Sequence, residues 1–189
     1  MPDATTSWAG ALVRLRAVEP ADWEHFRRWD EDTESARFGY FVHMPVSEKT
    51  NQQFAEDVSR DSQDHNRRWI IETLAGEPAG SLNVHGAEPR NGTFEYGLTV
   101  AREHWGKGFG AEAITIVLRY YFDELRYQKV LSVVYSFNER SQRLHQKLGF
   151  VEEGRLRRAH YSNGELHDSI LYGMLAEEFR DLHGRLTLA

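Results

Sequence analysis

A run of alternating glycines carries the strongest chemical signal in the sequence. It reads Trp105-Gly106-Lys107-Gly108-Phe109-Gly110 and lies between a predicted strand and a predicted helix. Glycine leaves backbone N–H groups uncovered, and a helix N-terminus carries partial positive charge, so phosphate oxygens can approach the main chain closely. The run therefore predicts an anion site, typically for phosphate.

Two familiar phosphate motifs fit this run poorly, and a third interpretation stays open. A P-loop needs Lys and then Ser or Thr at the end of G-x-x-x-x-G-K, and the sequence contains no such string. A dinucleotide-binding unit has the spacing G-x-G-x-x-G and an acidic residue about 20 residues later at a strand end. Here the spacing is G-x-G-x-G and the next strand ends at Ser136-Phe137-Asn138. The third interpretation is a tight strand-to-helix turn that binds nothing.

The elements around the run follow from hydrophobic patterning. The preceding strand is predicted over Phe94 to Val100, and the next strand over Lys129 to Tyr135. The helix between them has an apolar face at helical spacing, made of Ile114, Val117, Leu118, Tyr121, Phe122 and Leu125. Because a helix connects the two strands, we expect them to run parallel.

The remaining segments predict antiparallel strands and shorter helices. Before the run these are a strand over Leu12 to Val18, helices that begin at Pro20 and after Ser47, and a meander of Trp69 to Leu74, Gly80 to His85 and Phe94 to Val100. After it come a helix that Asn138 caps and Gly149 ends, and a hairpin of Phe150 to Tyr161 and Leu166 to Leu175 around Ser162-Asn163-Gly164-Glu165. The predicted class is α+β, a mixed and mostly antiparallel sheet with a central parallel pair, flanked by helices.

Length and composition predict one globular domain. The 189 residues show no repeat or linker, so we expect a flexible tail over residues 1–10 and a single domain over residues 11–189. No apolar stretch approaches the ~20 residues of a membrane span, and no secretory signal is visible. The absence of Cys fits a reducing cytoplasm, and the net charge of -6 disfavours a nucleic-acid partner. None of the nine His forms a compact metal pattern, so we expect no metal.

Several ordered motifs resemble the GCN5-related N-acetyltransferase (GNAT) superfamily, and within it the branch of ribosomal-protein N-terminal acetyltransferases and spermidine acetyltransferases. The motifs are Val13-Arg14-Leu15-Arg16, Phe94-Glu95-Tyr96-Gly97-Leu98-Thr99-Val100, Gly106 to Ala113, Asn138-Glu139-Arg140-Ser141 and Lys147 to Gly154. Together they cover nearly the whole chain. The resemblance implies that the parallel strands splay apart, that acetyl-CoA is the co-substrate, that the acceptor is an amine, and that the protein forms a homodimer.

By this resemblance the glycine run wraps the pyrophosphate of acetyl-CoA, with Gly108 and Gly110 at the family's glycine positions. Trp105 stands where the family has Arg or Gln, which leaves phosphate binding there to the backbone. The pantetheine arm is expected to pair with the strand edge at Leu98 to Val100. The full set of expected donor contacts is Leu98, Val100, Trp105, Gly106, Lys107, Gly108, Phe109, Gly110, Asn138 and Ser141.

Acetyl transfer to an amine calls for a base, for donors to the oxyanion, and for a proton on the leaving thiolate. Glu95 is the candidate base, and the alternative is an exposed or salt-bridged strand glutamate. His145 stands where many family members have a Tyr acid, and the alternative is a structural histidine. Ser141 is expected to contact CoA and assist thiol departure, while Asn138 can simply cap its helix.

Two charged segments have both a functional and an ordinary explanation. The acidic run Asp30-Glu31-Asp32-Thr33-Glu34 either attracts a cationic amine or is a solvated loop. A basic set either meets the 3′-phosphate of CoA or faces water, and its members are Arg155, Arg157 and Arg158.

The predicted function is transfer of an acetyl group from acetyl-CoA to a primary amine by direct attack. A protein N-terminal α-amine, a polyamine and an aminated small molecule all fit as acceptor. The alternative is a CoA-binding sensor or scaffold of the same fold that lacks catalysis.

Overall fold

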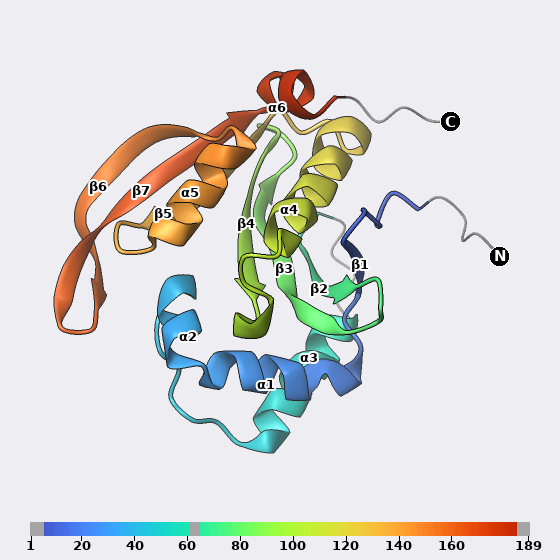
Figure 1. Cartoon of the computed structure of the whole chain (residues 1–189), viewed down its shortest axis with the longest axis vertical. Helices are drawn as coiled ribbons and strands as arrows, with labels where there is room; N and C mark the ends of the chain where they lie inside the picture. The colour runs from blue at the N-terminus through green and yellow to red at the C-terminus, as the bar shows by residue number, and fades with distance from the viewer. Residues whose placement is uncertain (1–5, 61–64, 185–189) are drawn as a thin grey trace. The chain divides into compact units, whose positions relative to one another are not determined.

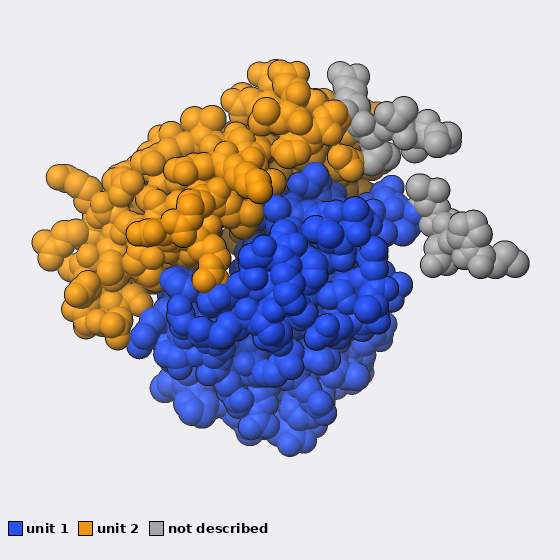
Figure 2. Space-filling model, in the orientation of Figure 1, with its two compact units in different colours: residues 1–84, 97–117 blue, residues 85–96, 118–189 orange. Residues whose placement is uncertain are grey.

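The computed structural model describes residues 6–60 and 65–184. The chain divides into two compact units (Figure 2): unit 1 contains Met1–Val84 and Gly97–Val117, and unit 2 contains His85–Tyr96 and Leu118–Ala189. Each described helix is too short or too polar to serve as a membrane span. The assignment of residues 11–189 to one domain stays a prediction.

Within the described ranges, seven strands form one mixed sheet in the order β1-β2-β3-β4-β5-β7-β6 (Figure 1). They span Val13–Ala17 (β1), Arg67–Thr73 (β2), Pro78–Glu88 (β3), Thr93–Val100 (β4), Lys129–Tyr135 (β5), Val151–Ser162 (β6) and Glu165–Leu175 (β7). β4 and β5 pair in parallel, with Phe94 opposite Val130, whereas β1–β2, β2–β3, β5–β7 and β6–β7 are antiparallel pairs. The predicted α+β class with one parallel pair is confirmed.

The α-helices are Trp23–Glu31 (α1), Thr33–Gly39 (α2), Glu48–Arg60 (α3), Phe109–Arg119 (α4), Glu139–Leu148 (α5) and Ala176–His183 (α6). Short 3-10 turns occupy Pro20–Asp22 (η1) and Arg102–His104 (η2), and a π-helical turn occupies Tyr120–Glu124 (η3). The helices expected from Pro20, after Ser47, after the glycine run and after Asn138 are confirmed. The patterning did not indicate α2 and α6, which are short.

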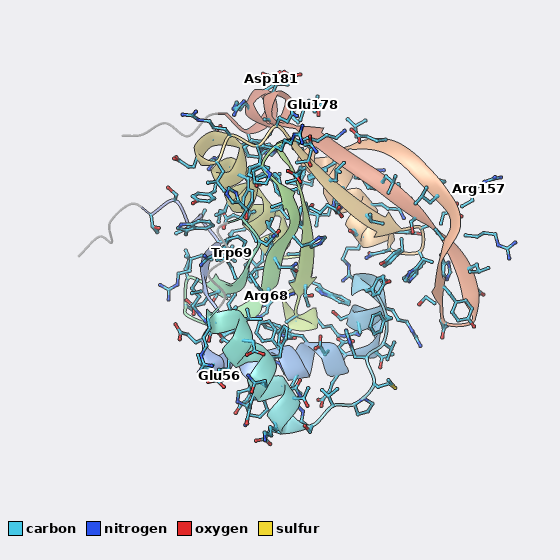
Figure 3. The ribbon with its side chains drawn as sticks, turned by 180° about the vertical axis from the view of Figure 1, so that it is seen from behind. Glu56, Arg68, Trp69, Arg157, Glu178 and Asp181 are labelled. Carbon is cyan, nitrogen blue, oxygen red and sulfur yellow. The ribbon has the colours of Figure 1, made fainter. Side chains whose placement is uncertain are left out.

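Unit 1 has a core of apolar side chains from α1, α3, β2 and the residues that directly follow β1 and β4. The cluster is Val18, Phe26, Trp29, Ala55, Ile70 and Ala101. Phe26 and Trp29 are three residues apart on α1, so both point from the same face into this core. On β2, the guanidinium of Arg68 lies 5.9 Å from the centre of the Phe26 ring, and the next residue, Trp69, faces the other way (both are labelled in Figure 3).

The residues just before β1 are packed onto unit 1. The Trp8 and Trp69 rings stack with their centres 5.4 Å apart. The backbone N–H of Leu15 donates to the Trp8 carbonyl at 2.8 Å. Residues 1–5 of the predicted tail lie outside the described residues, so the extent of that tail stays a prediction.

Unit 2 has an aromatic core beneath β4. The Phe94 ring lies 4.5 Å from that of Tyr121 and 5.4 Å from that of Tyr127. The π-helical turn that follows α4 is held by α6, because Arg180 donates to the Asp123 carboxylate and to the Phe122 carbonyl, both at 2.9 Å. These contacts explain why the last turn of the long predicted helix departs from α-helical geometry.

Candidate functional site

The end of β4 lies very close to β3 within unit 1. A Cβ atom at Gly80 would lie 2.1 Å from the Thr99 carbonyl oxygen and 2.9 Å from the Val100 Cα, so only glycine fits there. Just beyond, the N–H of Ala101 donates to the Ala79 carbonyl at 2.8 Å. Leu98 and Val100, which were expected to contact the donor, are half-buried on this stretch.

The glycine run forms the connection from β4 to α4 in unit 1. Gly106 has φ +77° and Gly108 has φ +85°, a left-handed conformation that other residues rarely adopt. Gly110 belongs to the first turn of α4, where the Glu112 N–H donates to the Gly108 carbonyl at 3.1 Å. The run therefore combines two left-handed glycines with a helix N-terminus, a geometry that can bind an anion.

The two side chains inside the run lie beside His104. The Lys107 ammonium is 3.4 Å from His104 Nδ1, and the Phe109 ring centre is 5.5 Å from that of His104. His104 itself is buried. Lys107 is exposed, so its charge is available to an anion at the run.

Glu112, in the first turn of α4, joins this helix to the segment at the start of β1. Its carboxylate accepts hydrogen bonds from the backbone N–H groups of Ala11, Leu12 and Val13, at 2.8, 2.7 and 2.7 Å. The same segment brings the end of the Leu12 side chain within 3.2 Å of the position of a Cβ at Gly108. These contacts were not predicted, because the sequence shows only an acidic residue in a first helical turn.

Trp105 is held between a backbone carbonyl and an arginine. Its indole N–H donates to the Val100 carbonyl at 2.7 Å. The guanidinium carbon of Arg102 lies 4.9 Å above its ring. Trp105 therefore uses its one polar hydrogen within unit 1, and a phosphate contact at this position stays a prediction.

Three of the four carboxylates in the acidic run are paired with arginines, while Asp30, near the end of α1, is exposed and has no ion-pair partner among the described residues. Asp32 caps α2, because its Oδ1 accepts from the N–H groups of Glu34 and Ser35, both at 3.2 Å. Arg102 donates to both oxygens of Asp32 and to Glu34, and its hydrogen bond holds the pKa of Asp32 below its usual value. Glu31 pairs with Arg27 at 2.8 Å on α1.

In unit 2, α5 begins and ends at the predicted residues. Asn138 Oδ1 accepts from the Ser141 N–H at 3.1 Å, which is a helix cap. Gly149 ends the helix with φ +92°. The capping interpretation of Asn138 is confirmed, while contacts of Asn138 and Ser141 with CoA stay predictions.

His145 lies at the centre of a buried polar cluster in unit 2. Its Nδ1 is 2.7 Å from the Ser141 carbonyl, so this nitrogen carries the proton and donates. Its Nε2 is 2.8 Å from the Tyr96 hydroxyl and 3.0 Å from the Ser132 hydroxyl, and it accepts from these groups. Only 3% of His145 is exposed. Burial lowers the pKa of His145 and raises that of Tyr96, so both side chains are neutral near pH 7.

The cluster predicts a specific dependence of stability on pH. The folded state disfavours protonation of His145, so below its ordinary pKa of about 6.5 the unfolded state binds more protons and folding weakens as pH falls. We expect His145→Gln to cost about 2 kcal/mol at pH 7.5 but to lose less stability than wild type between pH 7.5 and 5.5. Urea unfolding at both pH values measures this, and equal losses in the two proteins would contradict it.

Glu95 lies on the part of β4 that belongs to unit 2. It is half-buried and pairs with Leu131 of β5, and its Oε1 lies 3.6 Å from the position of a Cβ at Gly86. Among the described residues, no hydrogen bond or ion pair to its carboxylate is present, so the salt-bridged alternative has no support.

The basic residues of β6 are exposed on unit 2. Arg155 lies 3.4 Å from Asp168, and the Arg158 N–H donates to the same carboxylate at 2.9 Å. Arg157 projects outward from β6 (Figure 3). This arrangement favours the water-facing explanation.

No group of three or more metal-type ligands occurs in the part of the chain that the structure describes.

Comparisons with known proteins agree with this geometry. The chain matches the model of the acetyltransferase (GNAT) domain over residues 13–151. It is 39% identical over 181 residues to the SPbeta prophage-derived uncharacterized N-acetyltransferase YokL of Bacillus subtilis (strain 168), covering 96% of this chain and 99% of that protein. It is 28% identical over 170 residues to the putative ribosomal N-acetyltransferase YdaF of the same organism, covering 88% of this chain and 93% of that protein.

A solved structure supports the fold. The spermidine N-acetyltransferase from Vibrio cholerae, solved in complex with CoA and spermine, superposes with a TM-score of 0.80 at 23% identity. The superposition covers 90% of this chain and 99% of that chain.

The fold and the family match define an N-acetyltransferase that uses acetyl-CoA. The chain belongs to the GNAT acetyltransferase family. Its reaction is the transfer of an acetyl group from acetyl-CoA to a primary amine.

Proposed function

We propose that the acceptor is the α-amine of a protein or peptide N-terminus, as in the ribosomal-protein branch of the family. The observation that carries this is the pairing of most of the acidic run: Asp32 and Glu34 bind Arg102 and Glu31 binds Arg27, which leaves Asp30 as the one carboxylate of the run without an ion pair among the described residues. A polyamine needs several unpaired carboxylates, because each of its ammonium groups must keep a counter-charge when it leaves water. The relationship to a putative ribosomal N-acetyltransferase also favours a protein acceptor.

We propose that donor binding uses backbone more than side chains. N–H groups of the run from Gly106 to Gly110, with the exposed Lys107, bind the pyrophosphate. The strand edge at Leu98 to Val100 pairs with the pantetheine arm. The first turn of α5 contributes Ser141, whose position Asn138 fixes through its cap. Trp105 and Phe109 shape the run, since their rings contact Arg102 and His104.

For the chemistry, we propose that Glu95 accepts the proton of the amine directly or through water. An α-amine has a pKa near ~8 and is partly neutral at pH 7, so it needs less help than a lysine-type amine. The amine then attacks the thioester carbon, a backbone N–H near Val100 donates to the oxyanion, and the C–S bond breaks. Ser141 donates toward the leaving sulfur. His145 acts through Ser141, because its Nδ1–H is bound to the Ser141 carbonyl.

We further propose that the enzyme works in the cytoplasm as a homodimer without a nucleic-acid or membrane partner. A net charge of -6 repels anionic polymers and anionic lipid surfaces. The edge strand β6 favours self-association, because its apolar side chains Val151 and Leu156 are 51% and 52% exposed. Light scattering at micromolar concentration tests the dimer, and a single species of monomer mass would contradict it.

An acceptor panel tests the proposed function. We expect acetyl-CoA to be consumed with a peptide that has a free N-terminus. The rate should be at least about tenfold lower with the same peptide blocked at the N-terminus and carrying a lysine, and with spermidine. Release of CoA thiol measures the rates. A higher rate with spermidine than with the free peptide would contradict an α-amine acceptor. Binding of acetyl-CoA without turnover of any amine would instead indicate a sensor or scaffold.

A further inference from the structure

Arg102 uses all three guanidinium nitrogens on α2. Its Nε and one terminal nitrogen bind the two oxygens of Asp32 at 2.8 and 2.6 Å, and the other terminal nitrogen binds Glu34 at 2.6 Å. A fork-to-fork pair of this kind fixes the plane of the guanidinium as well as its position. Because Asp32 also caps α2, the start of this helix and Arg102 are joined through one carboxylate.

The fixed guanidinium plane lies over Trp105, the residue that opens the glycine run. The guanidinium carbon is 4.9 Å from the centre of the Trp105 ring, within the range of a cation–π interaction. The ring of Phe38, also on α2, lies 6.1 Å from that of Trp105. The indole N–H reaches the Val100 carbonyl, so Trp105 is held from both ends.

This arrangement contributes little to folding, and it contacts the first residue of the glycine run. Arg102 is 48% exposed and Glu34 is 52% exposed, and ion pairs with such exposure stabilise a protein only weakly. Gly106, which follows Trp105, has open space where a Cβ would lie, so no side chain packs against that side of the run. Trp105, at the start of the run, is one of the points at which neighbouring side chains anchor it.

We propose that Arg102 is a positioning residue for the donor site: by binding Asp32 and Glu34 and stacking on Trp105, it holds the glycine run in its phosphate-binding conformation. This inference rests on the proposed role of the run in binding acetyl-CoA. Trp105 stands where the resemblance implies Arg or Gln. Arg102, three residues earlier in the chain, positions the glycine run instead.

Arg102→Met tests the inference, because methionine keeps much of the apolar stem and removes the fork. We expect KM for acetyl-CoA to rise about tenfold while kcat changes less than about twofold, since the chemistry is untouched once the donor is bound. The KM of Arg102→Lys for acetyl-CoA should fall between those of wild type and Arg102→Met, because lysine keeps the charge without the planar fork. Arg27→Met is the matched control. Arg27 is 45% exposed and pairs with Glu31, and this pair does not contact the glycine run.

A double-mutant cycle separates positioning from a merely structural role. Trp105→Phe removes the bond to Val100, and we expect Arg102→Met to raise KM for acetyl-CoA much less in that background than in wild type. Glu34→Gln, at an exposed position, should raise KM in the same direction by a smaller factor. Equal KM values for Arg102→Met and Arg27→Met, or fully additive effects with Trp105→Phe, would overturn the inference. If the wild-type protein bound no acetyl-CoA by calorimetry, the proposed role of the run would fail instead.

Discussion

Glu95→Gln is expected to lower kcat with a peptide acceptor about 100-fold and to leave KM for acetyl-CoA near the wild-type value. Glutamine keeps the size of the side chain and cannot accept a proton. The carboxylate of Glu95 is half-buried and has no partner among the described residues, so its loss breaks no visible ion pair. Initial rates from pH 6 to about pH 9 measure the effect, and the residual rate of the variant should follow only the ionisation of the amine.

The control for this variant is Glu88→Gln, which changes a glutamate at the exposed end of β3 in the same unit. We expect wild-type rates from it. Full kcat for Glu95→Gln over the whole pH range would remove Glu95 as the base. A rise in KM for acetyl-CoA with unchanged kcat would place Glu95 in donor binding.

Gly108→Ala is expected to raise KM for acetyl-CoA about 100-fold. At φ +85° an added Cβ strains the backbone by about 1–2 kcal/mol. It also covers N–H groups that phosphate oxygens must reach. The contact of that Cβ with the end of the Leu12 side chain at 3.2 Å is easily relieved, because Leu12 is flexible and 43% exposed. Steady-state kinetics and calorimetric titration with CoA measure the loss.

Gly76→Ala separates backbone strain from phosphate binding. Gly76 has φ +86° in the turn between β2 and β3, and no heavy atom lies within 4 Å of where its Cβ would be. The two alanine variants should therefore lose similar stability. Only Gly108→Ala should lose affinity for CoA, and equal affinities in the two variants would contradict a phosphate site at the run.

Local sequence signals predicted much of the fold correctly. The β5 boundaries, the Asn138 cap and Gly149 stop of α5, and the hairpin turn at Asn163-Gly164 all depend on residues close together in the chain. α2 and α6 were missed because their seven and eight residues are too few for a clear helical period. The π-helical turn could not be predicted, because the Arg180 that holds it comes from a different helix.

The candidate site also has features that local sequence predicts and features that depend on distant segments. The glycine run was found from its spacing, and its two left-handed glycines follow from that pattern. The environments of His145 and Arg102 were not predictable, because burial and pairing arise between distant segments. Tyr96 and Ser132 reach His145 from β4 and β5, and Asp32 lies 70 residues before Arg102. The sequence therefore shows the charge of the acidic run, but not the arginines that pair with it.

Mass spectrometry of a single reaction mixture tests the central claim most directly. Enzyme, acetyl-CoA and a peptide with a free N-terminus are combined, and the masses of the peptide and of the intact enzyme are followed together. Direct attack predicts one acetyl group on the peptide α-amine, one CoA released for each, and no acetyl group on the enzyme at any time. An acetylated enzyme that forms before the peptide product, or acetyl-CoA that stays unconsumed with every amine offered, would contradict the account.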